Sequence, residues 1–301
     1  MPARRLPRVL IVNADDFGIS RGVNRGIVAA HRAGIVTSAS LMANLPSAED
    51  ALARAAACPD LGVGLHLTLT AGRPLSPPAT VASLVDGDGR FFVLGELLGR
   101  LFAGRVERGH IVRELRAQVE WGLRRGLVPT HLDAHHHIHV HPRVASVVLD
   151  LAREHRVGWV RCPVEVVAPG RLMRTGPRDV ARAAIISLFG AALRAGVRRA
   201  GLRTTRHFRG IALGMGFGEA ALVDALGALP RGLTELMTHP GEPDVELARF
   251  TDFAEGRDCE LAALTSPAAR TQLAAGRVRL ASFRELHQDF GREPSSGAAY
   301  T

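Results

Sequence analysis

Five histidines and one aspartate lie within residues 131–139, which read His-Leu-Asp-Ala-His-His-His-Ile-His. Neutral imidazole is the commonest metal-ligand side chain, and so dense a group of imidazoles is rarely structural. In a β-strand, alternation would place Asp133, His135, His137 and His139 on one face. The segment therefore predicts a metal site, in which His135 and His137 compete for the role of ligand.

Two adjacent carboxylates, Asp15 and Asp16, follow an apolar run near the N-terminus, in the segment NADDFG (13–18). At the end of a buried strand they are costly unless a cation or another partner offsets their charge. One interpretation assigns one aspartate to a metal ion and the other to proton transfer. The alternative is a polar turn that caps the next helix.

Three single residues have weaker local signals. His66 lies in an otherwise apolar strand, GLHLT (64–68), where a lone histidine is often a satisfied core residue. Arg161 closes another strand and could orient a carboxylate such as Asp15 through a charge-assisted bond, or could simply be solvated. His239 precedes a turn and reads as either a general acid or a loop imidazole.

Apolar runs alternate with helical patterns along the chain, which predicts a parallel α/β fold. We expect strands at Arg8–Ala14, Ile35–Met42, Leu61–Leu69, Thr130–His139, Val157–Arg161, Gly232–Thr238 and Val278–Phe283. Helices are expected after Ser20, with Val23, Ile27 and Ala30 on one face, and at Arg113–Arg125, Val144–Glu154 and Ala220–Leu229.

This number of strands favours closure into a (β/α) TIM-like barrel with parallel strands, with a doubly wound open sheet as the alternative. The aspartate pair, His66, His135, Arg161 and His239 all fall near the C-terminal end of an expected strand. Active sites of parallel barrels form at that edge, so residues distant in sequence are expected to converge there.

The composition predicts one α/β domain over residues 1–301, with an Arg-rich helical insertion around 171–209. Hydrophobic residues make up 47% of the chain, enough for a full core. Three cysteines without a CxxC pair argue against a disulfide framework and for a reducing cytoplasm. The apolar run at Val9–Val12 is too short for the core of a signal peptide.

Positive charge is concentrated in the segment 171–209, which holds ten arginines against one acidic residue, Asp179. Ile185, Phe189, Leu193 and Val197 recur every four residues in it. A basic amphipathic helix of this kind could lie on an anionic membrane surface. The alternative is a barrel helix or a homodimer face. The arginines also suggest nucleic-acid binding, but stacking residues between them and known DNA-binding motifs are missing, so no specific nucleic acid is expected.

At these residues the chain resembles the YdjC-like carbohydrate deacetylase family. The matching stretches run in family order: NADDFG (13–18), GIVTSASLM (34–42), GLHLTLTAGRPL (64–75), PTHLDAHHHIH (129–139), ELMTHPG (235–241) and ELAALTSP (260–267). The resemblance implies a distorted barrel with one divalent ion, zinc or magnesium, held by Asp16, His66 and His135. It also implies Asp15 as the catalytic base and His239 near the leaving group.

We accordingly expect a metal-dependent hydrolase that removes the N-acetyl group from a sugar containing N-acetylglucosamine. Arg161, Asp133 and His137 are expected to bind substrate or to orient other groups. The wording of the motifs resembles the hopanoid-associated branch, which implies an N-acetylglucosaminyl lipid and a cytoplasmic enzyme peripheral to the inner membrane. The alternatives are a soluble chitooligosaccharide deacetylase, a metal-dependent phosphoesterase and an inactive metal-binding relative.

Overall fold

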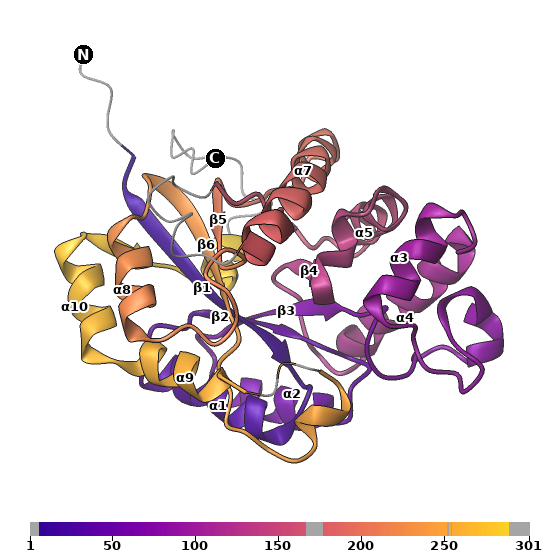
Figure 1. Cartoon of the computed structure of the whole chain (residues 1–301), viewed down its shortest axis with the longest axis horizontal. Helices are drawn as coiled ribbons and strands as arrows, with labels where there is room; N and C mark the ends of the chain where they lie inside the picture. Colours follow the sequence, from indigo (N-terminus) through magenta and orange to yellow (C-terminus); the bar gives the residue numbers. More distant parts are fainter. Residues whose placement is uncertain (1–5, 167–176, 252, 254, 289–301) are drawn as a thin grey trace.

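A parallel sheet forms the centre of the computed structural model, which describes residues 6–166, 177–251, 253 and 255–288 (Figure 1). In these residues seven strands follow the order β4-β3-β2-β1-β6-β5, and β7 pairs with β1. All the strand pairings are parallel. The strands are β1 (Arg8–Phe17), β2 (Ser38–Leu41), β3 (Gly62–Leu67), β4 (Leu132–Ala134), β5 (His207–Arg209), β6 (Gly232–Thr238) and β7 (Val278–Leu280).

The sheet continues past β4 and curves towards a barrel. Leu132 forms a parallel bridge with Val160, and Trp159 forms another with Arg203. The chain then leads from Arg203 to β5, which pairs with β6. Across the interior, Arg161 Nε donates to Glu235 on β6 at 2.8 Å. The prediction of a distorted parallel (β/α) barrel is therefore confirmed, with isolated bridges in place of the strand expected at Val157–Arg161.

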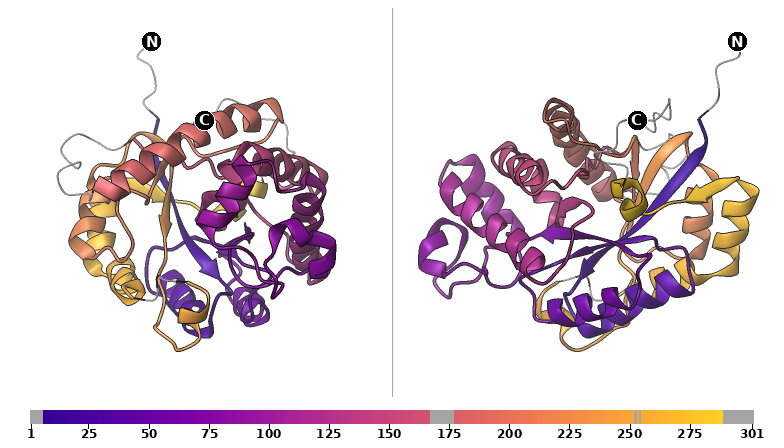
Figure 2. Two further views of the ribbon diagram at one scale, coloured as in Figure 1. Left: turned by 45° about the vertical axis from the view of Figure 1, so that its right-hand side comes forward. Right: turned by 180° about the vertical axis from the view of Figure 1, so that it is seen from behind.

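Helices surround this sheet, as two further views show (Figure 2). The α-helices are α1 (Arg21–Arg32), α2 (Ala48–Ala56), α3 (Leu94–Phe102), α4 (Arg108–Arg124), α5 (Pro142–Glu154), α7 (Pro177–Arg199), α8 (Glu219–Gly227), α9 (Arg257–Thr265), α10 (Pro267–Ala275) and α11 (Phe283–Gln288). Three 3₁₀ segments are η1 (Pro78–Leu84), η2 (His135–Val140) and η3 (Leu247–Arg249). Helix α1 packs between α2 and α9, and α5 packs between α4 and α7.

Local sequence explains the first strand and helix. Every residue of β1 after Arg8 is buried, as expected for a strand covered on both faces. The Ser20 side chain accepts a hydrogen bond from the backbone N–H of Val23 and caps α1. Val23, Ile27 and Ala30 are fully buried, so the predicted apolar face of this helix is confirmed.

The strand expected over Thr130–His139 is wrong beyond Ala134. Ala134 pairs with Leu67, where β3 also ends, so the chain has no strand partner to continue along. Residues 135–140 instead form the turn η2, in which His136 and His137 have φ angles of 55° and 56°. The alternation that placed His135, His137 and His139 on one face therefore does not apply.

Helix α7 occupies residues 177–199 of the Arg-rich segment, whose residues 171–176 lie outside the described part of the chain. The predicted apolar stripe divides along its length. Leu193 and Val197 are buried in the core, whereas Ile185 is 61% exposed and its neighbour Leu188 is 72% exposed. Among the described helices, α7 is the one long and apolar enough to cross a membrane by length and composition. The segment ends at β5, which belongs to the sheet.

Candidate metal centre

The residues predicted at the strand ends do converge. Asp15 and Asp16 lie at the end of β1, His66 near the end of β3, and His135 directly after β4. His239 follows β6. All five line one cavity of about 1180 Å³. The edge of the sheet that the sequence indicated is therefore the edge at which a site forms.

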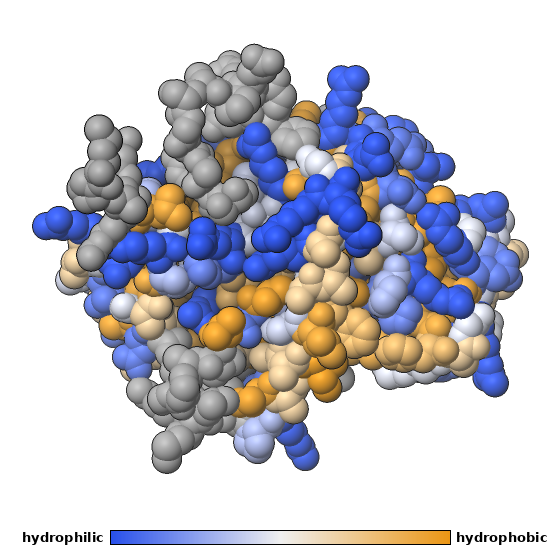
Figure 3. Space-filling model, turned by 90° about the horizontal axis from the view of Figure 1, so that it is seen from above, coloured by the Kyte–Doolittle hydropathy of each residue, from blue (hydrophilic) through white to orange (hydrophobic). Residues whose placement is uncertain are grey.

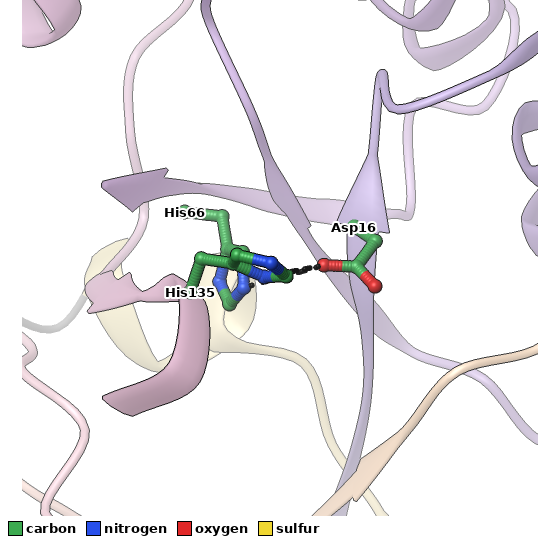
Figure 4. Close-up of side chains that lie close together, drawn as sticks. All are labelled: Asp16, His66 and His135. Atoms are coloured by element: carbon green, nitrogen blue, oxygen red, sulfur yellow. Dashed lines mark ion pairs between the residues drawn. The ribbon is translucent and has the colours of Figure 1, made fainter. Parts of the chain in front are cut away.

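Three of these side chains face one another at short range (Figure 4). Asp16 Oδ1 lies 3.1 Å from His135 Nδ1 and 3.5 Å from His66 Nε2. All three side chains are buried, and their ligand atoms lie within 4.8 Å of one another. Asp16 Oδ1 receives no hydrogen bond from the described residues. One carboxylate oxygen and two imidazole nitrogens, buried and directed at one another, could hold a metal ion.

A β-bulge explains how two adjacent aspartates reach the same cavity. In a regular strand, neighbouring side chains point to opposite faces. The pairing of β1 with β2 shifts register between Ala14 and Phe17, and Asp16 has a φ of 65°. Bulges of this kind re-aim side chains and are common beside active sites. The bulge therefore allows both Asp15 and Asp16 to line the cavity.

Asp133 contacts the imidazole of His66. Its Oδ1 accepts a hydrogen bond from His66 Nδ1 at 2.9 Å, which leaves Nε2 directed at Asp16. Metal-ligating histidines usually donate their second ring N–H to such a partner. Burial alone would lower the pKa of His66, but Asp133 and the two N-terminal aspartates outweigh it and raise the pKa to about 9. The orienting role of Asp133 stays a prediction, which this contact supports.

Arg161 is fully buried and is surrounded by acidic groups. Its Nη1 and Nη2 donate to the two oxygens of Asp15 at 2.6 and 2.7 Å. Nη1 also lies 2.7 Å from Asp133 Oδ2, and Nε donates to Glu235. The predicted contact between Arg161 and Asp15 is present. Burial opposes the charge of Arg161, but these carboxylates outweigh burial and raise its pKa well above the usual value.

The backbone of His239 is hydrogen-bonded to a side chain of helix α9. Its N–H donates to Glu260 Oε2 at 2.6 Å, and its ring stands nearly perpendicular to the ring of Phe253. Burial lowers the pKa of His239 to about 4, although Asp16 and Asp15 act in the opposite direction. The imidazole is therefore neutral near pH 7.

His137 lies beside the three candidate ligands and does not join them. It is buried, lines the same cavity and packs edge-on against Phe208 with a centroid distance of 5.9 Å. Burial first, and then Arg161, lower its pKa well below the usual value. Of the two histidines that competed in the sequence, the structure places His135 against Asp16.

Comparison with known proteins identifies the family. Residues 9–275 match the family model described as YdjC-like protein. The chain belongs to this family. A carbohydrate deacetylase of Geobacillus stearothermophilus is 40% identical over 283 residues, covering 94% of this chain and 100% of that protein. A carbohydrate deacetylase of Vibrio vulnificus strain CMCP6 is 34% identical and covers 92% of this chain and 96% of its own length.

A solved structure shares the fold. It comes from Enterococcus faecalis V583, is described as a candidate cellobiose-phosphate cleavage protein, and superposes with a TM-score of 0.75. It is 25% identical in sequence and covers 93% of this chain and 99% of that one. The fold and the family resemblance expected from the motifs are thus both confirmed.

Two site residues of this YdjC-like chain escaped sequence reasoning. Arg257, fully buried at the start of α9, donates from Nη2 to Asp16 Oδ2 at 2.6 Å. Glu235 accepts from Arg161 and is buried within β6; burial raises its pKa to about 7 despite that contact. Glu235 lies within the motif ELMTHPG and could have been found there. Arg257 lies three residues before the motif ELAALTSP (260–267), and no local sequence pattern distinguishes it.

Proposed function

We propose that this chain is a metal-dependent deacetylase that hydrolyses the N-acetyl group of a substrate containing N-acetylglucosamine, releasing acetate and a free amino sugar. The observation that carries the proposal is the arrangement of Asp16, His66 and His135 in one buried group that shares a cavity with Asp15 and His239. The relatives that match over most of this chain are named carbohydrate deacetylases, which supports the same reaction class.

The donor atoms proposed to hold the metal are Asp16 Oδ1, His66 Nε2 and His135 Nδ1. When bound there, a divalent ion lowers the pKa of water to about 7 and polarises the acetyl carbonyl. Two imidazole donors favour zinc over magnesium, because magnesium prefers oxygen ligands. Three protein ligands also match the usual catalytic zinc site, which keeps one position open for water or substrate.

Two residues of the chain are proposed to carry out the two proton transfers of the reaction. Asp15 is proposed to accept the proton of the attacking water, and Arg161 holds it in place with two charge-assisted hydrogen bonds. His239, or a water held by it, is proposed to protonate the departing amine. Its imidazole is neutral at rest, so it must gain that proton during the reaction.

A lipid-linked sugar, such as an N-acetylglucosaminyl hopanoid, is the finer proposal for the substrate. Apolar side chains of α3 and α7 line the outer part of the cavity, among them Leu98, Phe102, Ile185 and Phe189. Phe102 and Ile185 are each more than half exposed. Figure 3 shows hydrophobic residues gathered beside a band of hydrophilic ones on the face seen from above. The apolar side chains of α3 and α7 that line the cavity suit an apolar aglycone better than a second sugar ring.

Peripheral contact with an anionic membrane belongs to the same proposal. Arg178 and Arg182 lie on α7 beside its exposed apolar residues and also line the cavity. Binding at an interface combines buried apolar area with attraction to anionic lipid. The same exposed residues would also suit contact with a second copy of the chain. Pelleting with anionic vesicles at low salt, compared with the mass of the protein in solution, separates the two.

The deciding experiment measures acetate release from two substrates, diacetylchitobiose and the N-acetylglucosaminyl hopanoid, by metal-free and zinc-loaded protein. We expect release that depends on the metal and is faster with the lipid. Release from chitobiose alone would keep the deacetylase reaction and reject the lipid. Zinc-loaded protein that releases acetate from neither would reject the proposed function.

A further inference from the structure

The first turn of α9 contacts the candidate site from outside the sheet. Arg257 begins this helix, and Glu260 lies three residues later in the same first turn. Arg257 reaches Asp16 at the end of β1, while Glu260 reaches the backbone of His239 after β6. One helical turn therefore contacts a candidate ligand at the end of β1 and a candidate proton donor that follows β6.

Arg257 is held firmly in its place. Its Nε donates to the carbonyl of Phe253 at 3.0 Å, and its guanidinium carbon lies 5.0 Å from the centre of the Phe253 ring. Its own carbonyl accepts from the N–H of Gly241, two residues after His239. A buried guanidinium is costly unless it is paired, and Asp16 supplies the paired carboxylate.

This contact distinguishes the two oxygens of Asp16. Arg257 donates to Oδ2 at 2.6 Å, and Oδ1 is left facing His135 and His66. With Oδ2 engaged, a metal ion between these residues can use a single oxygen of the carboxylate. The φ of 65° at Asp16 is uncommon for a residue other than glycine, so its orientation depends on contacts of this kind.

Glu260 has a matching role at His239. Its Oε2 accepts from the N–H of His239 at 2.6 Å, and its Oε1 accepts from the N–H of Gly216 at 2.8 Å. The side chain is fully buried. Both oxygens are therefore used to fix backbone groups, which determines where the chain places the imidazole of His239.

We propose that the first turn of α9 positions the catalytic centre, with Arg257 restricting Asp16 to one ligating oxygen and Glu260 fixing the backbone of His239. Both are positioning residues, since they act through Asp16 and His239. The assignment rests on the proposed metal-dependent function. It predicts that the two residues influence different measurable quantities, although they lie on the same helical turn.

The test uses full-length Arg257→Met, Arg257→Lys and Glu260→Gln proteins, with Arg270→Met on the neighbouring α10 as a control. Zinc dissociation constants are measured without substrate by competition with a chromogenic chelator, well below each protein's unfolding temperature. Removing a group that orients a ligand typically costs about 10–100-fold in metal affinity. We expect a loss of that order for Arg257→Met and a smaller loss for Arg257→Lys.

For Glu260→Gln we expect zinc affinity equal to wild type and kcat lowered on the order of tenfold. A purely electrostatic Arg257 would repel the cation, so its removal would tighten zinc binding. Zinc binding by Arg257→Met that is tighter than wild type, or unchanged, overturns the assignment. If the methionine variant does not fold, zinc affinity equal to wild type in Arg257→Lys overturns it. Equal loss of zinc in the Arg257 and Glu260 variants would indicate a general structural role. Wild-type protein that binds no divalent ion would instead reject the proposed function.

Discussion

Replacing Asp15 with asparagine tests the division of roles between the two adjacent aspartates. The variant Asp15→Asn keeps the size of the side chain and removes its charge. In the wild type, both oxygens of Asp15 accept from Arg161, at 2.6 and 2.7 Å. The asparagine carbonyl can still accept one of these bonds, but its amide group would face a second guanidinium donor. Asp16, His66 and His135 keep their mutual contacts, so the metal affinity should be preserved.

The expected magnitudes follow from those contacts. A positioned base contributes about 10²–10⁴-fold to the rate, and we expect kcat to fall by an amount within that range. A hydrogen bond to a charged group contributes about 1.5–3 kcal/mol, so losing one should lower the free energy of unfolding by about that amount. Acetate release, zinc titration and urea unfolding measure the three quantities separately. Asp150→Asn, which removes an exposed ion pair with Arg108, is the control.

Two results would refute this reasoning. Near-normal acetate release by Asp15→Asn would show that another group accepts the proton. Loss of zinc together with activity would show that Asp15 belongs to the metal centre, and not to a separate base.

Three further predictions concern the surroundings of the site. Asp133→Asn should lower metal affinity or activity by about 10–100-fold because it weakens the orientation of His66, and wild-type values in both assays would contradict this role. Gly64→Ala should lower the free energy of unfolding by about 1–3 kcal/mol, since the added Cβ would lie 2.5 Å from the His131 carbonyl oxygen. Gly95→Ala, which has open space around the added Cβ, is the control. Equal urea midpoints for the two variants would exclude the clash. Burial lowers the pKa of His131 from 6.5 to about 4, so the unfolded chain binds this proton first as pH falls and stability is lost between those values. His131→Gln should therefore show a shallower fall in urea midpoint from pH 7 to pH 4, and parallel profiles would contradict the assignment.

The sequence predicted the parts of the site that depend on strand ends. Because parallel strands place their C-terminal ends on one edge, the aspartate pair could be grouped with His66, His135, Arg161 and His239 without knowing any side-chain angle. The family resemblance was needed to single out Asp16, His66 and His135 as the expected ligands. Strand β1 was predictable because it begins with the apolar run Val9–Val12 and is buried on both faces. Strand β6 is also buried along its whole length, although its apolar residues are interrupted by Thr234 and Glu235 and it ends at Thr238.

Other features depend on contacts that a local pattern does not contain. Arg257 meets Asp16 across 241 residues of sequence, so only the packed fold reveals the pair. The turn at His135–Val140 was misread because its residues are compatible with a strand, and the end of β3 is what stops the pairing. Strand β5 is three residues long and carries two basic side chains, which hides it from any search for apolar runs.

The bulge at the end of β1 has a consequence for how the site could change. It places the proposed proton acceptor and the proposed ligand on neighbouring residues joined by one trans peptide, so their Cα atoms are about 3.8 Å apart by covalent geometry. The distance between these two Cα atoms therefore does not depend on side-chain packing. Loosening of the barrel rim by heat or mutation would therefore displace both carboxylates together relative to His66 and His135. Asp15 and Asp16 therefore move as one unit, whereas His66 and His135 lie on other segments and can each change their distance from that unit separately.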